Sequence, residues 1–275
     1  MIRNHRMIAI RLSAAITSNP MGGIRLTWMG LLLTGLWGLG GCQPEPLSPL
    51  QGSVWAKDTL TALAYPAFLV DTSTAERYRQ QGLVYRSGGD LERSVATLKI
   101  AAALDPYSPN SHIILGWTQH LAGDRPNAIT TLTTALRQDP DQVQALNALG
   151  IVYLVEGQLD QATATHHRAL ELKPDNEIAH YNLSLAYQRL GEWDPAIHHA
   201  QKATELEPQN PHPWVALALA LAASGDSAAA QTTYQQAIQI DRRYLSRSHL
   251  NHLDRAGFSA PQIDAVAKLQ AMASP

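Results

Sequence analysis

The sequence contains few of the residues and motifs from which catalytic or metal-binding sites are built. Cys42 is the only cysteine among the 275 residues, so no disulfide can form within the chain. There is no Gly-x-Ser-x-Gly elbow for a nucleophilic serine and no glycine-rich phosphate loop. The 11 histidines include no pair four residues apart on a helix with an acidic third ligand. Neither an enzyme nor a metal site nor a cofactor is therefore predicted.

Two pairs of adjacent histidines, at 166–167 and 198–199, need a separate explanation. Adjacent residues on a helix point to different faces, so neither pair can share one ligand position. We expect His166 to lie inward at a helix–helix contact, and His167 and His199 to lie on solvated faces.

A hydrophobic run long enough to cross a membrane is also missing. Residues 1–25 carry four arginines and no acidic residue, and an uncharged run follows as far as Cys42. This run is shorter than the roughly 20 apolar residues that a transmembrane helix needs, and it contains five glycines. A positive segment followed by a short apolar segment is typical of a secretory signal peptide.

The end of this run, Leu39-Gly40-Gly41-Cys42, resembles the bacterial lipobox. The resemblance implies that residues 1–41 are a lipoprotein signal peptide and that Cys42 is lipidated and begins the mature chain. It also implies a lipoprotein of the bacterial cell envelope, anchored to a membrane and facing the periplasm or the exterior. The alternatives are a plain secretory signal or a tail that stays as a short membrane anchor. Translation from Met21 instead of Met1 would still give a signal of ordinary length.

Positive charge is scarce in the rest of the chain. Residues 43–275 keep 17 of the 21 Lys and Arg but all 23 Asp and Glu, which gives a net charge of −6. They contain no basic run and no basic patch interleaved with aromatic residues. Because binding to phosphates needs clustered positive charge, no nucleic-acid partner is predicted.

What the sequence does contain is a repeat of 34 residues. Five gapless units occupy residues 75–108, 109–142, 143–176, 177–210 and 211–244. In each unit a helical apolar pattern stops at a glycine in the fifteenth position and then resumes. A proline, which cannot continue a helix, closes each of the first four units. Small residues at the eighth position mark where two helices cross closely: Gly82, Gly116, Gly150, Ser184 and Ala218.

This unit resembles the tetratricopeptide repeat (TPR), a helix–turn–helix of 34 residues, over about three-fifths of the chain. The resemblance implies an all-α fold, namely a right-handed TPR solenoid of five helix–turn–helix repeats with irregular N- and C-terminal caps. The N-terminal cap is assigned to residues 42–74, together with the lipidated Cys42 and a tether. The C-terminal cap is assigned to helices within residues 245–275.

Both flanks of the array carry features of caps. Residues 54–70 are apolar and are expected to cover the first repeat, or else to lie in the groove of the array. Residues 73–76 form a capping-box pattern that predicts the start of the first helix. Residues 244–255 are predicted to be helical, with Gly257 as the stop, and residues 259–262 predict the start of a last helix. We interpret these C-terminal helices as a solvating cap, with a docking helix as the alternative.

In TPR arrays the first helices of successive repeats line a concave groove in which partners usually bind. Domains that clamp a terminal carboxylate need Lys, Arg and Asn there, whereas the ninth residues of these units form an apolar stripe. Such a groove suits an amphipathic helix or an extended apolar segment, unless tight packing or a capping segment buries it. The candidate groove residues carried over from the family are Arg79, Leu83, Ile113, Trp117, His120, Asn147, Ile151, Leu154, Tyr181, Leu185, Gln188, Val215 and Leu219.

These features together predict a non-catalytic, membrane-anchored TPR scaffold or adaptor. It would bind a segment of a protein partner in its concave groove, during assembly of an envelope or membrane complex. The architecture is similar to that of bacterial TPR lipoproteins that serve pilus assembly, secretion or the regulation of cell-wall enzymes. The alternative is a periplasmic holdase or a regulator of cell-wall hydrolases. A holdase should bind many apolar peptides weakly, whereas a scaffold should bind one or two partners.

Overall fold

The computed structural model describes residues 70–273. Within this range all regular secondary structure is helical and no strand occurs. None of the described helices is long and apolar enough to span a membrane. The predicted signal peptide at 1–41, Cys42, the tether and most of the N-terminal cap predicted at 42–74 lie outside the described residues.

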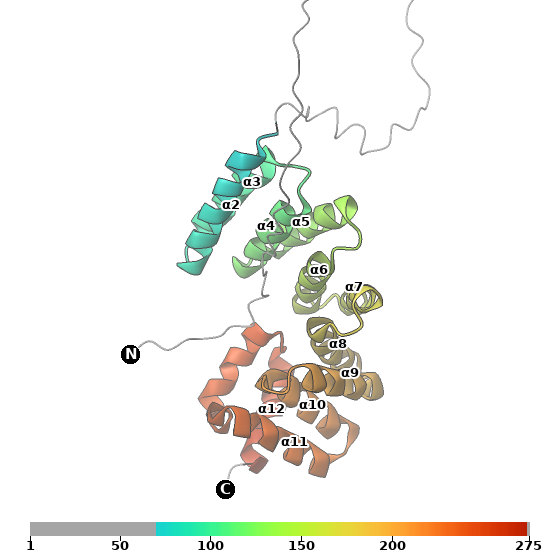
Figure 1. Ribbon diagram of the computed structural model, residues 1–275. Helices are drawn as coiled ribbons and strands as arrows, with labels where there is room; N and C mark the ends of the chain where they lie inside the picture. Colours follow the sequence, from blue (N-terminus) through green and yellow to red (C-terminus); the bar gives the residue numbers. More distant parts are fainter. Residues whose placement is uncertain (1–69, 274–275) are drawn as a thin grey trace, which may run out of the picture. The chain divides into compact units, whose positions relative to one another are not determined.

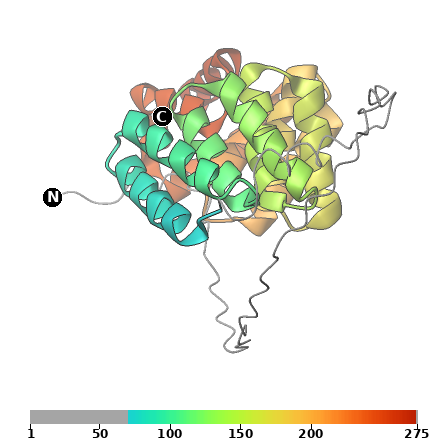
Figure 2. The ribbon, with the colours of Figure 1, turned by 90° about the horizontal axis from the view of Figure 1, so that it is seen from above.

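Residues 72–240 form five helix–turn–helix pairs, which follow one another in sequence order (Figures 1 and 2). The two helices of a pair pack against each other, and each second helix also packs against the first helix of the next pair. Contacts between successive first helices complete the array. The pairs are α2 (Thr72–Ser87) with α3 (Leu91–Leu104), α4 (Pro109–Leu121) with α5 (Arg125–Gln138), α6 (Val143–Glu156) with α7 (Leu159–Leu172), α8 (Glu177–Leu190) with α9 (Trp193–Leu206), and α10 (Pro211–Ser224) with α11 (Ser227–Ile240).

A glycine with positive φ lies in the turn after the first helix of each pair, as the sequence predicts. Gly157 follows α6 with a φ of 78°, and Gly191 follows α8 with the same φ of 78°. A residue with a Cβ is strained at this positive φ, whereas glycine is not. Glycine is therefore favoured at this turn. The N–H of Gly157 bonds to the carbonyl of Leu154 and thereby satisfies one of the last carbonyls of the helix.

Small residues allow the two helices of a pair to cross closely. A Cβ added to Gly150 would lie 2.5 Å from Nε2 of His166, and one added to Gly116 would lie 2.7 Å from Cγ of Leu132. His166 is fully buried, which confirms its predicted place at a helix–helix contact. The glycine of the eighth position therefore gives room to a larger side chain on the second helix.

The first helix begins earlier than the capping box predicts. Its N-cap is Asp71, whose Oδ1 accepts the Thr74 N–H at 2.9 Å and the Ser73 hydroxyl at 2.9 Å. Hydrogen bonds from Thr74 and then Ser73 lower the pKa of the Asp71 carboxyl to about 2. A carboxylate at this end of a helix accepts free N–H groups, and its charge is favoured by the helix dipole. Residues 72–74 therefore belong to α2 rather than to a cap.

After the fifth pair the chain leaves the repeat pattern. The helix predicted at 244–255 is instead two 3-10 helices, η2 (Arg242–Leu245) and η3 (Arg247–Ala256), separated at Ser246. Gly257 ends η3 with a φ of 90°, which confirms the predicted stop. The last helix, α12 (Ala260–Ala273), starts at the predicted capping box, where Oε1 of Gln262 accepts the Ser259 N–H at 2.9 Å. α12 packs against η3, α10 and α11 (Figure 1).

Candidate functional site

All thirteen predicted groove residues lie on the five first helices, α2, α4, α6, α8 and α10. We call the surface that they form the first-helix face. The structure divides these residues into three groups. Some stay partly exposed, some hold neighbouring repeats together, and some are covered by the C-terminal segment, residues 242–273.

The apolar stripe is open in the first three repeats. Leu83 on α2, Trp117 on α4 and Ile151 on α6 occupy the ninth position of their units and are partly exposed. The Trp117 ring lies 5.0 Å from the ring of His120, which is one turn further along α4. Burial, followed by the charge of Arg125, lowers the pKa of His120 to about 4, so this imidazole is neutral at physiological pH. The open part of the face is therefore apolar, with an aromatic side chain at its middle repeat.

The charged candidate on this face, Arg79, is already held by the protein. Its guanidinium forms an ion pair with Glu76, lies 3.6 Å from Oδ2 of Asp105 and donates to Oγ of Ser111 at 2.7 Å. Only 12% of its side chain is exposed. Arg79 thus joins the first repeat to the second, and an arginine neutralised in this way is a poor clamp for a partner's carboxylate.

Two further candidates are buried between repeats. Asn147 is 5% exposed, and its amide exchanges hydrogen bonds of 2.9 and 3.2 Å with the amide of Asn176. Asn176 is the N-cap of α8 and accepts the Ala179 N–H, so the pair ties α6 to the start of α8. Ile113 is 3% exposed and packs with Ala135. Both side chains are parts of the core in this structure.

The remaining candidates lie beneath the C-terminal segment. The Tyr181 hydroxyl donates to the carbonyl of Ala256 at 2.6 Å, and the Phe258 ring lies 6.4 Å from the Tyr181 ring. Burial raises the pKa of Tyr181 well above its ordinary value, so the phenol remains a donor. Leu154, Tyr181, Leu185, Val215 and Leu219 belong to one core cluster with Phe258 of the segment.

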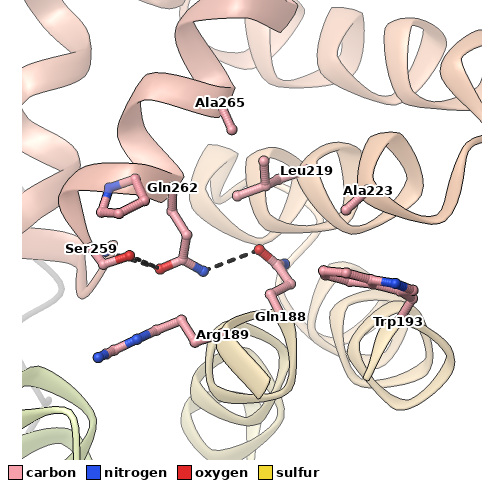
Figure 3. Close-up of a pocket in the computed structure, with 9 residues that line it drawn as sticks. Gln188, Arg189, Trp193, Leu219, Ala223, Ser259, Gln262 and Ala265 are labelled. Atoms are coloured by element: carbon pink, nitrogen blue, oxygen red, sulfur yellow. Dashed lines mark hydrogen bonds between the residues drawn. The ribbon is translucent and has the colours of Figure 1, made fainter. Parts of the chain in front are cut away.

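An amide bridge adds a polar contact to this apolar one. The side-chain amide of Gln262 donates to the carbonyl of Leu185 at 3.3 Å and to Oε1 of Gln188 at 3.1 Å (Figure 3). Gln188 in turn donates to the carbonyl of Ala216 at 2.8 Å. Of the two possibilities left open by the sequence, a capping segment that buries the stripe is the one observed in repeats four and five. There it covers a surface that would otherwise be available to a partner.

A pocket of about 500 Å³ lies at the edge of this contact, where the ends of α8 and α10 meet the start of α12. Gln188 and Gln262, joined by their hydrogen bond, line this pocket, while the guanidinium of Arg189 points away from it (Figure 3). Arg189 instead donates to the carbonyl of Leu154 on α6. The described pocket residues therefore bring no nucleophile together with a base. They are Gln188, Arg189, Trp193, Leu219, Ala223, Ser259, Pro261, Gln262 and Ala265.

Family models of the tetratricopeptide repeat match residues 131–164, 152–191, 178–210 and 211–244. The chain contains tetratricopeptide repeats. No curated protein matches the chain. Together with the helix pairs described above, these matches and the similar solved structures confirm the predicted all-α, right-handed TPR solenoid.

The similar solved structures are TPR proteins of low sequence identity. MamA 41-end from Desulfovibrio magneticus RS-1 is 23% identical with a TM-score of 0.57, over 62% of this chain and 96% of that chain. A second MamA crystal structure is 24% identical with a TM-score of 0.54, over 62% of this chain and 93% of that chain. YrrB, described as a TPR protein with an unusual peptide-binding site, is 21% identical with a TM-score of 0.51, over 62% and 87%. At these identities the likeness concerns the TPR fold alone.

One of the adjacent histidines, His199, does not lie on a solvated face as predicted. His199 is 8% exposed rather than solvated, because its Nδ1 lies 2.9 Å from Nδ1 of His180 and its ring stacks on Tyr187 at 5.7 Å. Burial, then the neighbouring His180, lowers the pKa of His199 to about 3. Within residues 70–273 no group of three or more His, Cys, Asp or Glu side chains is arranged to hold a metal ion.

The TPR pattern does not indicate the residues that cover the first-helix face. The sequence indicates only local roles for Gly257, as a helix stop, and for Gln262, within a capping box. The contacts of the C-terminal segment reach back along the chain to Tyr181, which lies 75 residues before Ala256. The only sequence signal was the placement of Phe258, one of the two phenylalanines, directly after a glycine stop.

Proposed function

We propose that this chain is a non-catalytic TPR scaffold or adaptor that binds a segment of another protein on its first-helix face. The observation that carries the proposal is the contact with the C-terminal segment. That segment supplies a backbone carbonyl to Tyr181, an aromatic ring beside it and an amide to Gln188. The face therefore already has the donors and apolar positions with which a protein segment is bound.

The open part of the face is where we place the partner. Leu83, Trp117 and Ile151 are partly exposed there, and aromatic residues often dominate the energy of protein interfaces. An amphipathic helix or an extended apolar segment matches this stripe best, because its ninth positions are apolar and Arg79 is already paired with Glu76. The likeness of the fold to YrrB, whose description names a peptide-binding site, supports the same class of ligand.

Membrane anchoring is the second part of the proposal and rests on the N-terminal sequence. Lipidation of Cys42 would tether the array to a membrane of the bacterial envelope, facing the periplasm or the exterior, while an envelope complex assembles. Mass spectrometry of membrane fractions tests this. Cys42→Ala should give an unlipidated chain that is unprocessed or soluble. A Cys42→Ala chain that is still processed and still sediments with membranes would contradict the lipobox interpretation.

The partner site is tested by crosslinking in intact cells, with Trp117→Glu/Ile151→Glu as the variant. Two charges in the apolar stripe should abolish recovery of the partner, because burying a carboxylate against apolar groups is unfavourable. Ile100→Glu is the matched control, since Ile100 is 44% exposed and lies on a second helix, α3. Circular dichroism should show that all three proteins fold.

Three outcomes separate the possibilities. Loss of one or two specific partners in the double variant, with the Ile100→Glu control unchanged, supports the scaffold. Undiminished recovery by a folded double variant would show that the first-helix face is not the site. Recovery of many unrelated apolar chains by the unmodified protein would indicate a holdase instead.

A further inference from the structure

We propose that three histidines form a pH-sensitive latch, which holds the C-terminal segment on the first-helix face and loosens it on acidification. The latch consists of His212 on α10 and of His249 and His252 on η3, together with Tyr244 on η2. The inference concerns the regulation of the face to which we assign partner binding, and only its purpose rests on that proposed function.

His252 is the centre of the latch. Its Nδ1 is hydrogen-bonded to the carbonyl of His249, and because a carbonyl only accepts, this nitrogen carries a proton. Its Nε2 lies 3.1 Å from the Tyr244 hydroxyl and 3.3 Å from Nε2 of His212. The His249 ring stacks on the His252 ring with centroids 4.0 Å apart.

When the rings are neutral, the facing Nε2 atoms of His212 and His252 can share a hydrogen bond instead of repelling each other. With its proton on Nδ1, His252 presents the single lone pair of Nε2 to the Tyr244 hydroxyl and to Nε2–H of His212. Because Nε2 of His212 carries the proton of this contact, a further proton on His212 would have to go to its Nδ1. That Nδ1 is buried and has no hydrogen-bond partner among the described residues. Two cationic rings at this separation would also repel each other in a poorly solvated site.

Asp241 offsets added positive charge on His212 and His249 only in part. Asp241 directly precedes η2, and its Oδ2 lies 4.0 Å from Nε2 of His249. The same carboxylate already accepts from Arg243, whose Nη2 lies 2.7 Å and whose Nε lies 3.0 Å from Oδ2. Arg243 thus neutralises this acid and lowers the pKa of His249 further, after burial and His252. The α11 neighbour, Tyr234, donates its hydroxyl to the Tyr244 carbonyl and is uncharged.

The latch is mechanically connected to the covered part of the first-helix face. Tyr244 is fully buried in the same core cluster as Tyr181 and Phe258. η3 runs from the latch directly to Ala256, whose carbonyl accepts from Tyr181, and then to Phe258. Displacement of η3 would therefore withdraw both groups from Tyr181 and expose part of the apolar stripe.

The direction of the pH effect follows from His212. Burial, then His252 and His249, lowers the pKa of His212 to about 4, from an ordinary value near 6.5 that His212 would regain once the segment leaves α10. Between these two values the released form binds a proton and the closed form does not. Release is therefore favoured as pH falls, by about 30-fold at pH 5 relative to pH 8 for this one group.

Hydrogen–deuterium exchange on the full chain tests the latch without any partner. After correction for intrinsic exchange rates, peptides from residues 256–272 should exchange about 30-fold faster at pH 5 than at pH 7.5. Peptides from α2, at residues 72–87, should change much less, since α2 contains no histidine. Equal acceleration of both regions, or no acceleration of residues 256–272, would overturn the proposal.

Variants locate the effect in the latch. His212→Gln/His252→Gln keeps a donor and an acceptor at each position but cannot titrate, so the pH dependence of residues 256–272 should fall to about threefold or less. His180→Gln/His199→Gln is the matched control, because it removes the other close histidine pair, on α8 and α9, and should leave that pH dependence intact.

The opposite pattern would overturn the proposal. In that case the exchange of residues 256–272 would lose its pH dependence in His180→Gln/His199→Gln and keep it in His212→Gln/His252→Gln. If the latch variant fails to fold, the exchange of the unmodified chain at the two pH values still decides. Because no partner is present, a negative result here leaves the test of Trp117 and Ile151 untouched.

Discussion

The two ends of the first-helix face use the same repeat positions but present different surfaces. In the ninth position, Leu83, Trp117 and Ile151 are partly exposed, whereas Leu185 and Leu219 are 0% and 5% exposed. The repeat supplies an apolar residue at both ends, and the C-terminal segment covers it at only one. Whether a repeated apolar position is a binding surface or a piece of core is therefore decided by what lies outside the repeat.

Removing the ring that covers the buried end should have the largest effect. Phe258→Ala deletes a side chain that is 4% exposed and should lower the free energy of unfolding by about 3–5 kcal/mol. Leu83→Ala, at the open end, should cost about 1 kcal/mol or less, since that side chain is partly solvated in the folded state. Urea unfolding of the full chain measures both. Equal losses for the two variants would show that the ends do not differ as described.

A substitution in the third repeat tests the close crossing of the two helices within a repeat. This crossing occurs at both ends of the array. Gly150→Ala places a Cβ 2.5 Å from the fully buried His166 ring and should destabilise the protein by about 1–3 kcal/mol. His166→Ala in the same chain should recover part of that loss, because the smaller residue makes room for the new methyl group. A double-mutant cycle by thermal unfolding measures the coupling. Simple additivity of the two changes would contradict the close contact.

The hydrogen bond between Tyr181 and the segment should contribute less. Tyr181→Phe removes the donor to the Ala256 carbonyl and should cost about 1–2 kcal/mol, because that acceptor then loses its partner in a buried site. Tyr78→Phe, in the first repeat, is the control and should be nearly neutral, since Tyr78 is 37% exposed. Chemical denaturation should separate the two variants. A neutral Tyr181→Phe would show that the hydroxyl is not needed for the cover.

The smallest expected effect concerns pH at the open end. The pKa of His120 is lowered to about 4, so its neutral form stabilises the fold above about pH 6.5, and this contribution is lost as pH falls toward 4. His120→Gln should reduce the loss of stability between pH 7 and pH 5 by about 1 kcal/mol, a value discounted for its partial exposure. Thermal unfolding at the two pH values measures it. An unchanged loss would mean that His120 is well solvated.

Several parts of the structure follow from local sequence features. The glycines at the fifteenth positions, the small eighth residues and the closing prolines predict the helices, the turns and their pairing. Gly257 and the capping box at residues 259–262 predict the end of η3 and the start of α12. Errors arise where two local solutions compete, as at Asp71, which caps α2 in place of Ser73, and in η2 and η3, where a single helix was expected.

Local sequence features predict less of the candidate site. The TPR pattern places the thirteen residues on the correct helices, but it cannot say which of them the protein itself uses. Asn147 is bonded to Asn176, Arg79 donates to Ser111, and Tyr181 is covered by a segment far along the chain. Each of these contacts depends on side chains brought together by the fold.

By itself, the sequence determined the repeating frame, because each repeat packs only on its neighbours and its contacts recur at a fixed spacing. The tertiary structure alone decided which apolar positions of that frame stay exposed. The contact of Tyr181 with Ala256 spans 75 residues, and that of His212 with His252 spans 40 residues. No periodic pattern encodes such pairs, since they form only when the end of the chain folds back onto the array.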